Sequence, residues 1–312
     1  MKVLITGGAG FVGSHLADKY LALGYEVVIV DDFSTGKQSN IDLAVKNGAK
    51  VYKAKLQSPA IQEILKKEKP DLISHHCAQK SVRDSVTDPQ KDADINLMGL
   101  IHLMEAARET SCRKIIYASS GGVVYGETSQ IPTDESHPKR PMSPYGITKY
   151  TSELYLDYYV QEFGFHATCL RYANIYGPRQ DPAGEAGVVA IFSQKMKAQE
   201  NMSIFGTGKQ TRDFVFVGDV VLANIAAEKN LKGFQAFNIG TGKETSILEI
   251  HQTLAKISNY EKTVTFEPAR SGEQMRSCLS YENFKKATGW QPQTNLEQGL
   301  KQTYEWILRS IT

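Results

Sequence analysis

Short apolar runs alternate with longer amphipathic stretches over the first two thirds of the chain. The apolar runs are rich in β-branched residues and are bounded by polar residues or glycine: KVLIT, EVVIVDD, KVYKA, DLISHH, KIIYAS and HATCLRY. The stretches between them, such as SHLADKYLALG and INLMGLIHLMEAARETS, have the periodicity of helices. Strand–helix alternation with nearly continuous apolar strands predicts a parallel sheet covered by helices on both faces.

After Tyr176 the pattern loosens. GPRQDPAGEAG has the composition of a long loop, and VVAIFSQKMKAQ and MSIFG predict a helix and a short strand. RDFVFVGDVVLANIAAEK and AFNIGTG predict a strand, a helix and a strand that return to the sheet. We therefore expect an α/β fold with a doubly wound, Rossmann-type domain over residues 1–175, with return segments at about 213–242. A smaller mixed α/β C-terminal lobe would comprise residues 176–212 and 243–312.

The bulk properties exclude several classes of protein. The 312 residues are 41% hydrophobic and 22% charged, the balance of an ordinary soluble protein. A net charge of +2 gives no reason to expect a nucleic-acid or membrane partner. No apolar run has the length of a membrane span, and no secretory leader follows Met1. The four cysteines lack the spacing of metal ligands, which predicts unpaired thiols, no metal site and a cytoplasmic location.

The glycine-rich run GGAGFVG lies between the first predicted strand and the first predicted helix. In this context Gly7 permits a tight turn, Gly10 allows a pyrophosphate close to the backbone, and Gly13 allows the helix to pack against the strand. The N–H groups and the dipole of the helix then face the phosphates. The run predicts a dinucleotide site.

Asp31 ends the second predicted strand, at the distance from the glycines where a carboxylate accepts hydrogen bonds from the adenosine ribose. A 2′-phosphate would be repelled there, which favours NAD over NADP. Asp32 is placed to share this task.

The segment SPYGITKY carries the most informative candidate chemistry. Ser143 is a plausible N-cap and Pro144 suits a first helical turn. Tyr145 and Lys149 are then four residues apart on one helix face. Because an ammonium close to a phenol favours the phenolate, and a positively charged nicotinamide would favour it further, we expect Tyr145 to be a base near neutral pH.

With these residues the sequence resembles the extended short-chain dehydrogenase/reductase family, and within it the UDP-glucose 4-epimerase group of nucleotide-sugar epimerases. The motifs GGAGFVG, INLMG, ASSGGVVYG, SPYGITKY, LRYANIYGPRQ and TRDFVFVGD stand in the family's order over nearly the whole chain. The resemblance implies C4 epimerisation of UDP-hexoses through a transient 4-keto sugar. Tyr145 would remove the proton from O4 while hydride passes to NAD and returns to the other face, and Lys149 would lower the tyrosine pKa and hold the nicotinamide ribose.

The family's catalytic serine or threonine usually stands four residues before the tyrosine of its VYG motif. Gly121 occupies that position here, so Ser120 is the better match and Ser119 the alternative. In related 4,6-dehydratases an Asp–Glu pair precedes the same motif. The residues here are Gly122, Val123 and Val124, so dehydration is not expected.

The resemblance also implies further binding residues. Cofactor contacts are expected at Phe11, Val12, Ser34, Gly36, Leu56, Lys80 and Asn96, in addition to the glycines, the acidic pair, Tyr145 and Lys149. Lys55 stands where many relatives carry an aspartate that reaches the adenine, which would leave that contact to the Leu56 backbone. Substrate contacts are expected at Ser120, Asn174, Val188, Phe205, Arg212, Arg270, Glu273 and Ser277. Ser277 matches a gate position, where a small side chain leaves room for N-acetylated sugars, so UDP-GlcNAc and UDP-GalNAc are expected substrates as well.

Family members commonly dimerise through the INLMG helix and the tyrosine helix, so the resemblance implies a homodimer. Two alternatives remain open. One is another nucleotide-sugar enzyme of the family, such as a UDP-glucuronate 4-epimerase or a decarboxylase. The other is a non-enzymatic NAD-sensing protein on the same fold, which the presence of both Tyr145 and Lys149 disfavours.

Overall fold

The computed structural model describes residues 1–182, 187–269 and 274–309 and divides the chain into two compact units. The first unit comprises Met1–Gly126, Pro138–Arg171 and Val221–Phe237, and the second comprises Glu127–His137, Tyr172–Val220 and Asn238–Thr312. These boundaries differ from the expected ones. Residues 127–137 belong to the second unit because Thr133 exchanges backbone hydrogen bonds with Cys278 and Ser280.

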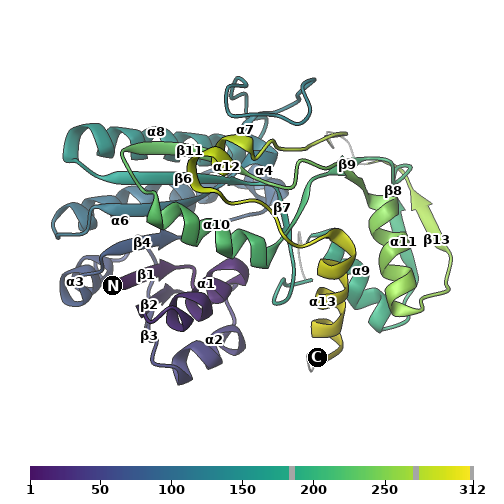
Figure 1. Ribbon diagram of the computed structural model, residues 1–312, viewed down its shortest axis with the longest axis horizontal. Helices are drawn as coiled ribbons and strands as arrows, with labels where there is room; N and C mark the ends of the chain where they lie inside the picture. Colours follow the sequence, from purple (N-terminus) through teal and green to yellow (C-terminus); the bar gives the residue numbers. More distant parts are fainter. Residues whose placement is uncertain (183–186, 270–273, 310–312) are drawn as a thin grey trace. The chain divides into compact units, whose positions relative to one another are not determined.

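The first unit is built on a seven-stranded sheet (Figure 1). The strand order is β11-β6-β5-β4-β1-β2-β3. The strands are β1 (Lys2–Thr6), β2 (Glu26–Asp31), β3 (Lys50–Lys53), β4 (Leu72–His75), β5 (Lys114–Ser120), β6 (His166–Tyr172) and β11 (Phe234–Ile239). β1 pairs in parallel with both β2 and β4, so the order of the strands reverses at β1. This arrangement confirms the predicted doubly wound fold, whose ligand sites lie at the carboxyl ends of the strands where the order reverses.

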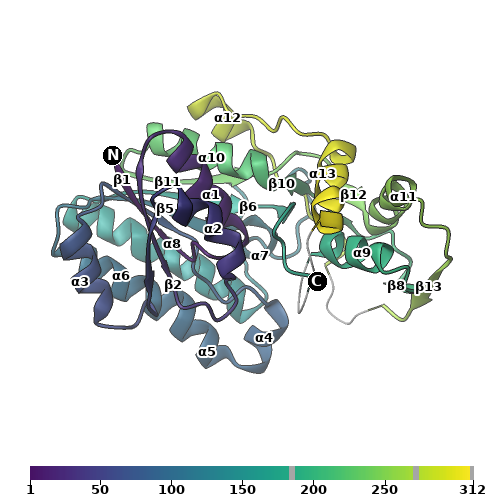
Figure 2. The ribbon, with the colours of Figure 1, turned by 90° about the horizontal axis from the view of Figure 1, so that it is seen from below.

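Helices cover both faces of this sheet (Figure 2). On one face lie α1 (Phe11–Ala22), α2 (Gln38–Lys46) and α10 (Val217–Lys229), and on the other lie α3 (Ala60–Glu68), α6 (Gly99–Arg108) and α8 (Pro144–Phe163). Apolar side chains of β1, α3, α6 and α8 form one buried cluster that includes Leu4, Ile61, Leu100 and Leu156. Burial of each such side chain stabilises the fold by about 1.5–3 kcal/mol.

Short helices connect the main elements of the first unit. They are α4 (Val82–Thr87), α5 (Pro89–Ala93) and α7 (Gly121–Val124). The sequence predicted one regular helix over INLMG and the residues after it. The structure differs at INLMG. Residues 95–98 lie in one π-helical stretch, η1 (Asp94–Met98), that joins α5 to α6, and Gly99 begins α6. Such single turns of π-helix are frequent at functional sites.

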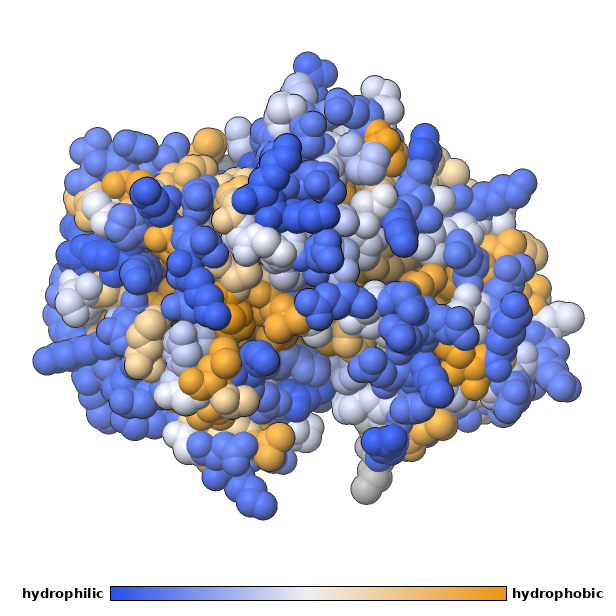
Figure 3. All heavy atoms as spheres, in the orientation of Figure 1, coloured by the Kyte–Doolittle hydropathy of each residue, from blue (hydrophilic) through white to orange (hydrophobic). Residues whose placement is uncertain are grey.

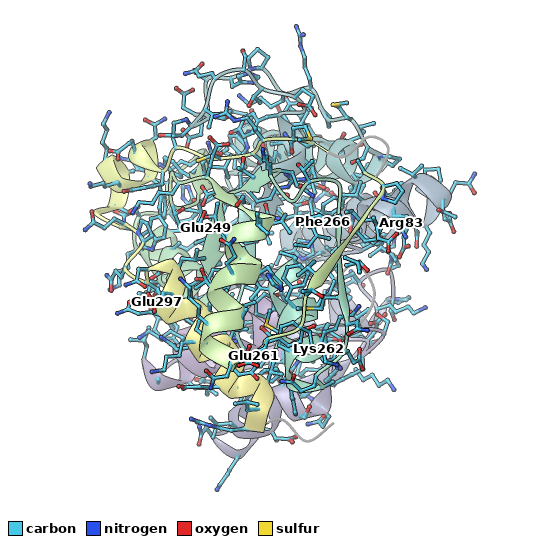
Figure 4. All side chains as sticks on the ribbon, turned by 90° about the vertical axis from the view of Figure 1, so that its right-hand side faces the viewer. Arg83, Glu249, Glu261, Lys262, Phe266 and Glu297 are labelled. Atoms are coloured by element: carbon cyan, nitrogen blue, oxygen red, sulfur yellow. The ribbon has the colours of Figure 1, made fainter. Side chains whose placement is uncertain are left out.

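The second unit contains three two-stranded sheets and four helices among the described residues. β7 (Asn174–Tyr176) pairs with β10 (Phe214–Phe216), β8 (Met202–Phe205) with β13 (Val264–Glu267), and β9 (Thr211–Arg212) with β12 (Thr245–Ser246). The helices are α9 (Val188–Lys197), α11 (Ile247–Ser258), α12 (Glu282–Thr288) and α13 (Leu296–Arg309). Figure 4 shows Glu249 near the beginning of α11, and Glu261 with Lys262 beyond its end, in the connection to β13, which carries Phe266.

On the face drawn in Figure 3, hydrophilic residues cover most of the surface and apolar residues lie in separate patches. Within the described ranges, no helix is both long enough and apolar enough to span a membrane.

Candidate functional site

The glycine turn forms a tight cradle between β1 and α1. Gly7 has a φ of +66°, and its carbonyl oxygen accepts a hydrogen bond from the Gly10 N–H at 3.1 Å. A Cβ at Gly7 would lie 2.7 Å from the Cys77 nitrogen, and one at Gly13 would lie 2.3 Å from the Gly7 oxygen. No side chain caps the beginning of α1, and no acidic residue lies in its first turn. A helix N-terminus with these properties fits the pyrophosphate of a dinucleotide.

The acidic pair is built into the same region. Asp31 is buried and accepts hydrogen bonds from the backbone N–H groups of Ala9 and Phe33, both at 2.9 Å. Burial raises the pKa of Asp31, and these backbone hydrogen bonds oppose the rise. The Asp32 carboxylate accepts from the Ser34 N–H and hydroxyl at 2.9 and 2.6 Å. Asp31 therefore holds the glycine turn in addition to its expected role toward the ribose.

Gly36 and Leu56 lie close to other parts of the predicted cofactor site. A Cβ at Gly36 would lie 2.7 Å from the Asp31 carboxylate, so the loop after β2 passes directly against that side chain. Leu56 is buried in the core of the first unit, whereas Lys55 is exposed. The lysine thus lies at the surface, beside a residue whose side chain is used for packing.

Lys149 is almost completely buried on α8. Ser143 caps this helix by accepting from the Gly146 N–H at 3.1 Å, as expected. The Lys149 ammonium donates to the Ala118 carbonyl oxygen at 2.8 Å and lies 5.9 Å from the centre of the Tyr145 ring. Burial lowers the pKa of Lys149 to about 8, and surrounding negative charges oppose this shift.

The environment of Tyr145 changes the pKa of its phenol. Burial raises the pKa of its phenol to about 12, a hydrogen bond with the Ser120 side chain lowers it, and the charge of Asp92 raises it. The protein's own groups therefore do not bring the phenol near neutrality, and the prediction that Lys149 together with a positively charged nicotinamide makes Tyr145 a base near neutral pH stays a prediction. The physical reason is desolvation, which disfavours the phenolate more strongly than the nearby groups favour it.

The two candidate serines have different partners. Ser120 contacts Tyr145, whereas the Ser119 hydroxyl donates to Glu153 at 2.5 Å and is buried. The structure therefore brings Ser120 to the tyrosine and directs Ser119 into an interior network.

A second interior network surrounds Asn96 and contains Asp92, which the sequence analysis missed. The Asn96 amide donates to Asp92 at 3.1 Å and to the Gln79 carbonyl oxygen at 3.0 Å, and its oxygen accepts from the Gln79 N–H at 2.9 Å. Asp92 also accepts from the Thr148 hydroxyl at 2.7 Å. Asn96 thus fixes the backbone before Lys80, which is itself exposed. A carboxylate four residues before Asn96 was the only signal in the sequence.

In the second unit, three of the predicted substrate residues lie on short strands and one begins a helix. Asn174 begins β7, and its N–H donates to the Asp213 carbonyl oxygen at 2.9 Å. Arg212 ends β9, and its guanidinium donates to the Thr211 carbonyl oxygen at 2.8 Å. Val188 begins α9, Phe205 ends β8 with 37% of its surface exposed, and Ser277 is buried. Arg270 and Glu273 lie outside the described residues.

Asp213 joins two of these segments, and it was not among the residues predicted from the sequence. Its buried carboxylate accepts from the N–H and hydroxyl of Thr241 and from the Leu279 N–H. Burial raises the pKa of Asp213, and these hydrogen bonds oppose the rise. Asp213 therefore links the strand region after Arg212 to the segment after Ser277.

Comparison with known proteins gives a consistent result. Residues 3–240 match the model of the NAD dependent epimerase/dehydratase family. The chain is 43% identical over 308 residues to the UDP-glucose 4-epimerase of Mycolicibacterium smegmatis, with 98% of each sequence covered.

Two solved structures are also similar. The UDP-glucose 4-epimerase of Thermotoga maritima, solved with UDP-glucose, has a TM-score of 0.94 at 43% identity over 98% of each chain. The UDP-glucose 4-epimerase of Thermus thermophilus, in complex with NAD, has a TM-score of 0.93 at 36% identity over 100% of each chain.

Proposed function

Because this chain belongs to the NAD dependent epimerase/dehydratase family, we propose that it inverts C4 of UDP-hexoses, converting UDP-glucose and UDP-galactose through a transient 4-keto sugar. The family match confirms the resemblance found in the sequence motifs, and NAD as the cofactor. The observation that carries the proposal is the contact of Tyr145 with Ser120, next to Lys149, in a chain that matches UDP-glucose 4-epimerases over nearly its full length.

Each group of this cluster has a distinct task. Tyr145 takes the proton of the sugar O4 hydroxyl and later returns it, and Ser120 orients that proton through its hydrogen bond to the phenol. Lys149 is held by the Ala118 carbonyl oxygen, which keeps its charge beside the phenol ring. NAD, when bound by the glycine turn and Asp31, supplies the reversible acceptor for the hydride.

The pKa of about 12 limits what Tyr145 can do by itself. A phenol with this pKa loses its proton at pH 7 only at a cost of about 7 kcal/mol. We therefore infer that bound ligands, rather than Lys149 alone, lower the pKa of Tyr145 during turnover.

The test is a product analysis without added reductant. Purified protein is incubated with NAD and one of UDP-glucose, UDP-galactose, UDP-GlcNAc or UDP-glucuronate, and the products are separated. We expect interconversion of UDP-glucose and UDP-galactose. Tyr145→Phe should abolish turnover while NAD binding persists, and Tyr155→Phe, at an exposed position of the same helix, should leave turnover unchanged. Absence of any 4-epimer from every sugar would refute the proposed function.

We further propose that N-acetylated UDP-hexoses are substrates. Ser277 is a small residue at the position that the family resemblance identifies as a gate, and it lies beside the segment anchored by Asp213. Comparable kcat/KM values for UDP-glucose and UDP-GlcNAc are expected. A strong preference for plain sugars that persists in Ser277→Ala would contradict this extension.

A homodimer is supported by an apolar stripe in the first unit. Ile147, Leu154 and Tyr158 are each about half exposed along α8, and Met98 in η1 is 43% exposed. Large apolar side chains aligned on one helix face are typical of an interface. Light scattering should give twice the chain mass, and Leu154→Glu should shift the protein to monomer. The four unpaired cysteines support a cytoplasmic location.

A further inference from the structure

A buried ion pair between Glu153 and Arg171 lies in the first unit, away from any assigned contact with cofactor or substrate. The Arg171 Nε lies 3.0 Å from Glu153 Oε1, and its Nη2 lies 2.5 Å from Oε2. The Arg171 side chain is 5% exposed and the Glu153 side chain is 2% exposed. Attraction within a buried ion pair often fails to recover the free energy of removing both charges from water. Stability alone therefore does not explain why the pair is present.

The remaining hydrogen bonds of this pair reach both ends of one short segment. Glu153 Oε1 accepts from the Ser119 hydroxyl at 2.5 Å. Arg171 Nη1 donates to the Tyr125 hydroxyl at 2.9 Å, and the guanidinium carbon lies 5.4 Å from the centre of the Tyr125 ring. The ion pair thus holds the residue before Ser120 and the residue that follows α7.

The held segment contains Ser120 and begins α7 with two glycines. Gly121 and Gly122 have no side chains to restrict the backbone, so a helical segment of this composition loses much conformational entropy on ordering. Contacts at both ends limit the positions that Ser120 can adopt. The same ion pair also joins β5, β6 and the residue after α7 to α8, because Glu153 lies on α8 two helical turns after Tyr145.

We propose that Glu153 and Arg171 are positioning residues that fix Ser120 against Tyr145 by holding Ser119 and Tyr125. This inference rests on the proposed function for its kinetic consequence, but its structural claim concerns only the contact between Ser120 and Tyr145. Displacement of a catalytic group by about 1 Å can reduce a rate by about a hundredfold. Loss of this support should therefore lower kcat and leave cofactor binding unchanged.

Two variants separate positioning from folding. Glu153→Gln keeps the shape of the side chain but leaves Arg171 with an unpaired charge, so it can reduce stability. The double variant Glu153→Leu/Arg171→Met removes both charges and fills the space with apolar side chains, a replacement that commonly preserves stability. The control is Glu109→Gln, which removes the exposed ion pair between Glu109 and Lys66, a pair with an N–O distance of 2.9 Å.

We expect the double variant to unfold within a few degrees of wild type, to bind NAD within about threefold, and to lose at least about thirtyfold in kcat with KM changed less than about threefold. Glu109→Gln should match wild type in every measurement. Wild-type kcat in a double variant that folds would overturn the proposal.

A spectroscopic measurement tests the structural claim without turnover. In NMR spectra of protein labelled with ¹³C at the Cζ of tyrosine, the resonance that disappears in Tyr145→Phe belongs to Tyr145. In the double variant this resonance should move toward its position in Ser120→Ala, because both changes remove the Ser120 hydrogen bond. A resonance that does not move in the double variant would refute the inference, whether or not the wild-type protein is active. Inactivity of the wild-type protein on every UDP-sugar would refute only the proposed function.

Discussion

Substitution of Gly13 by alanine tests how the glycine turn works. The added Cβ would lie 2.3 Å from the Gly7 oxygen, and 2.9 Å from both the Gly7 carbon and the Gly8 Cα. All three neighbours are backbone atoms, which cannot rotate away as a side chain can. To reach a tolerable separation of 3.0 Å, α1 and the turn must move apart by about 0.7 Å.

Two opposing effects determine how much Gly13→Ala changes the free energy of unfolding. Alanine is favoured over glycine within a helix by about 1 kcal/mol. Overpacking costs about 1–3 kcal/mol, and contact with backbone atoms of both Gly7 and Gly8 places this position at the upper end. The clash therefore prevails, with an expected net loss of about 1–2 kcal/mol in the free energy of unfolding. Because the turn must move away from the helix N-terminus, NAD affinity should fall at least tenfold, which is about 1.4 kcal/mol.

Calorimetric titration with NAD and thermal unfolding of the cofactor-free protein measure the two effects. Gly99→Ala is a matched control, since Gly99 is also helical and buried but its added Cβ would lie 3.4 Å from the Leu56 side chain, an ordinary contact. This control should be as stable as wild type or more stable by up to about 1 kcal/mol. If Gly13→Ala binds NAD as tightly as wild type, or Gly99→Ala loses equal affinity, the reasoning from the close backbone approach is wrong.

Three other changes give distinct outcomes. Burial alone would raise the pKa of Glu68, but hydrogen bonds from Tyr52 and two lysines lower it to about 2. Glu68→Gln should therefore lose up to about 3 kcal/mol of unfolding free energy at pH 7. Chemical denaturation should show this difference vanish as pH falls from about 4.5 to 2. A difference that does not depend on pH would contradict this reasoning. Asp31→Asn should weaken NAD binding more than NADP binding, because a carboxylate that repels a 2′-phosphate is removed, and an unchanged ratio of Kd values would oppose this assignment. Ser277→Tyr should lower kcat/KM for UDP-GlcNAc at least about tenfold relative to UDP-glucose, whereas equal losses would argue against a gate.

The parts predicted from the sequence are those that depend on local pattern. The alternation of apolar runs and amphipathic stretches predicted the parallel sheet, because each period shows which faces of an element are buried. The turn at Gly7 and the helical pair of Tyr145 and Lys149 were predicted because spacing along a turn or helix determines the geometry directly.

The tertiary structure decided what depends on residues far apart in the chain. It separated Ser120 from Ser119 through Tyr145 and Glu153, and it paired Asp92 with Thr148 across 56 residues. It also raised the pKa of Tyr145 to about 12, because burial is a property of the packed protein. Local sequence encodes which surface an element buries, but the partner of a buried polar group is determined only when distant elements meet in the fold.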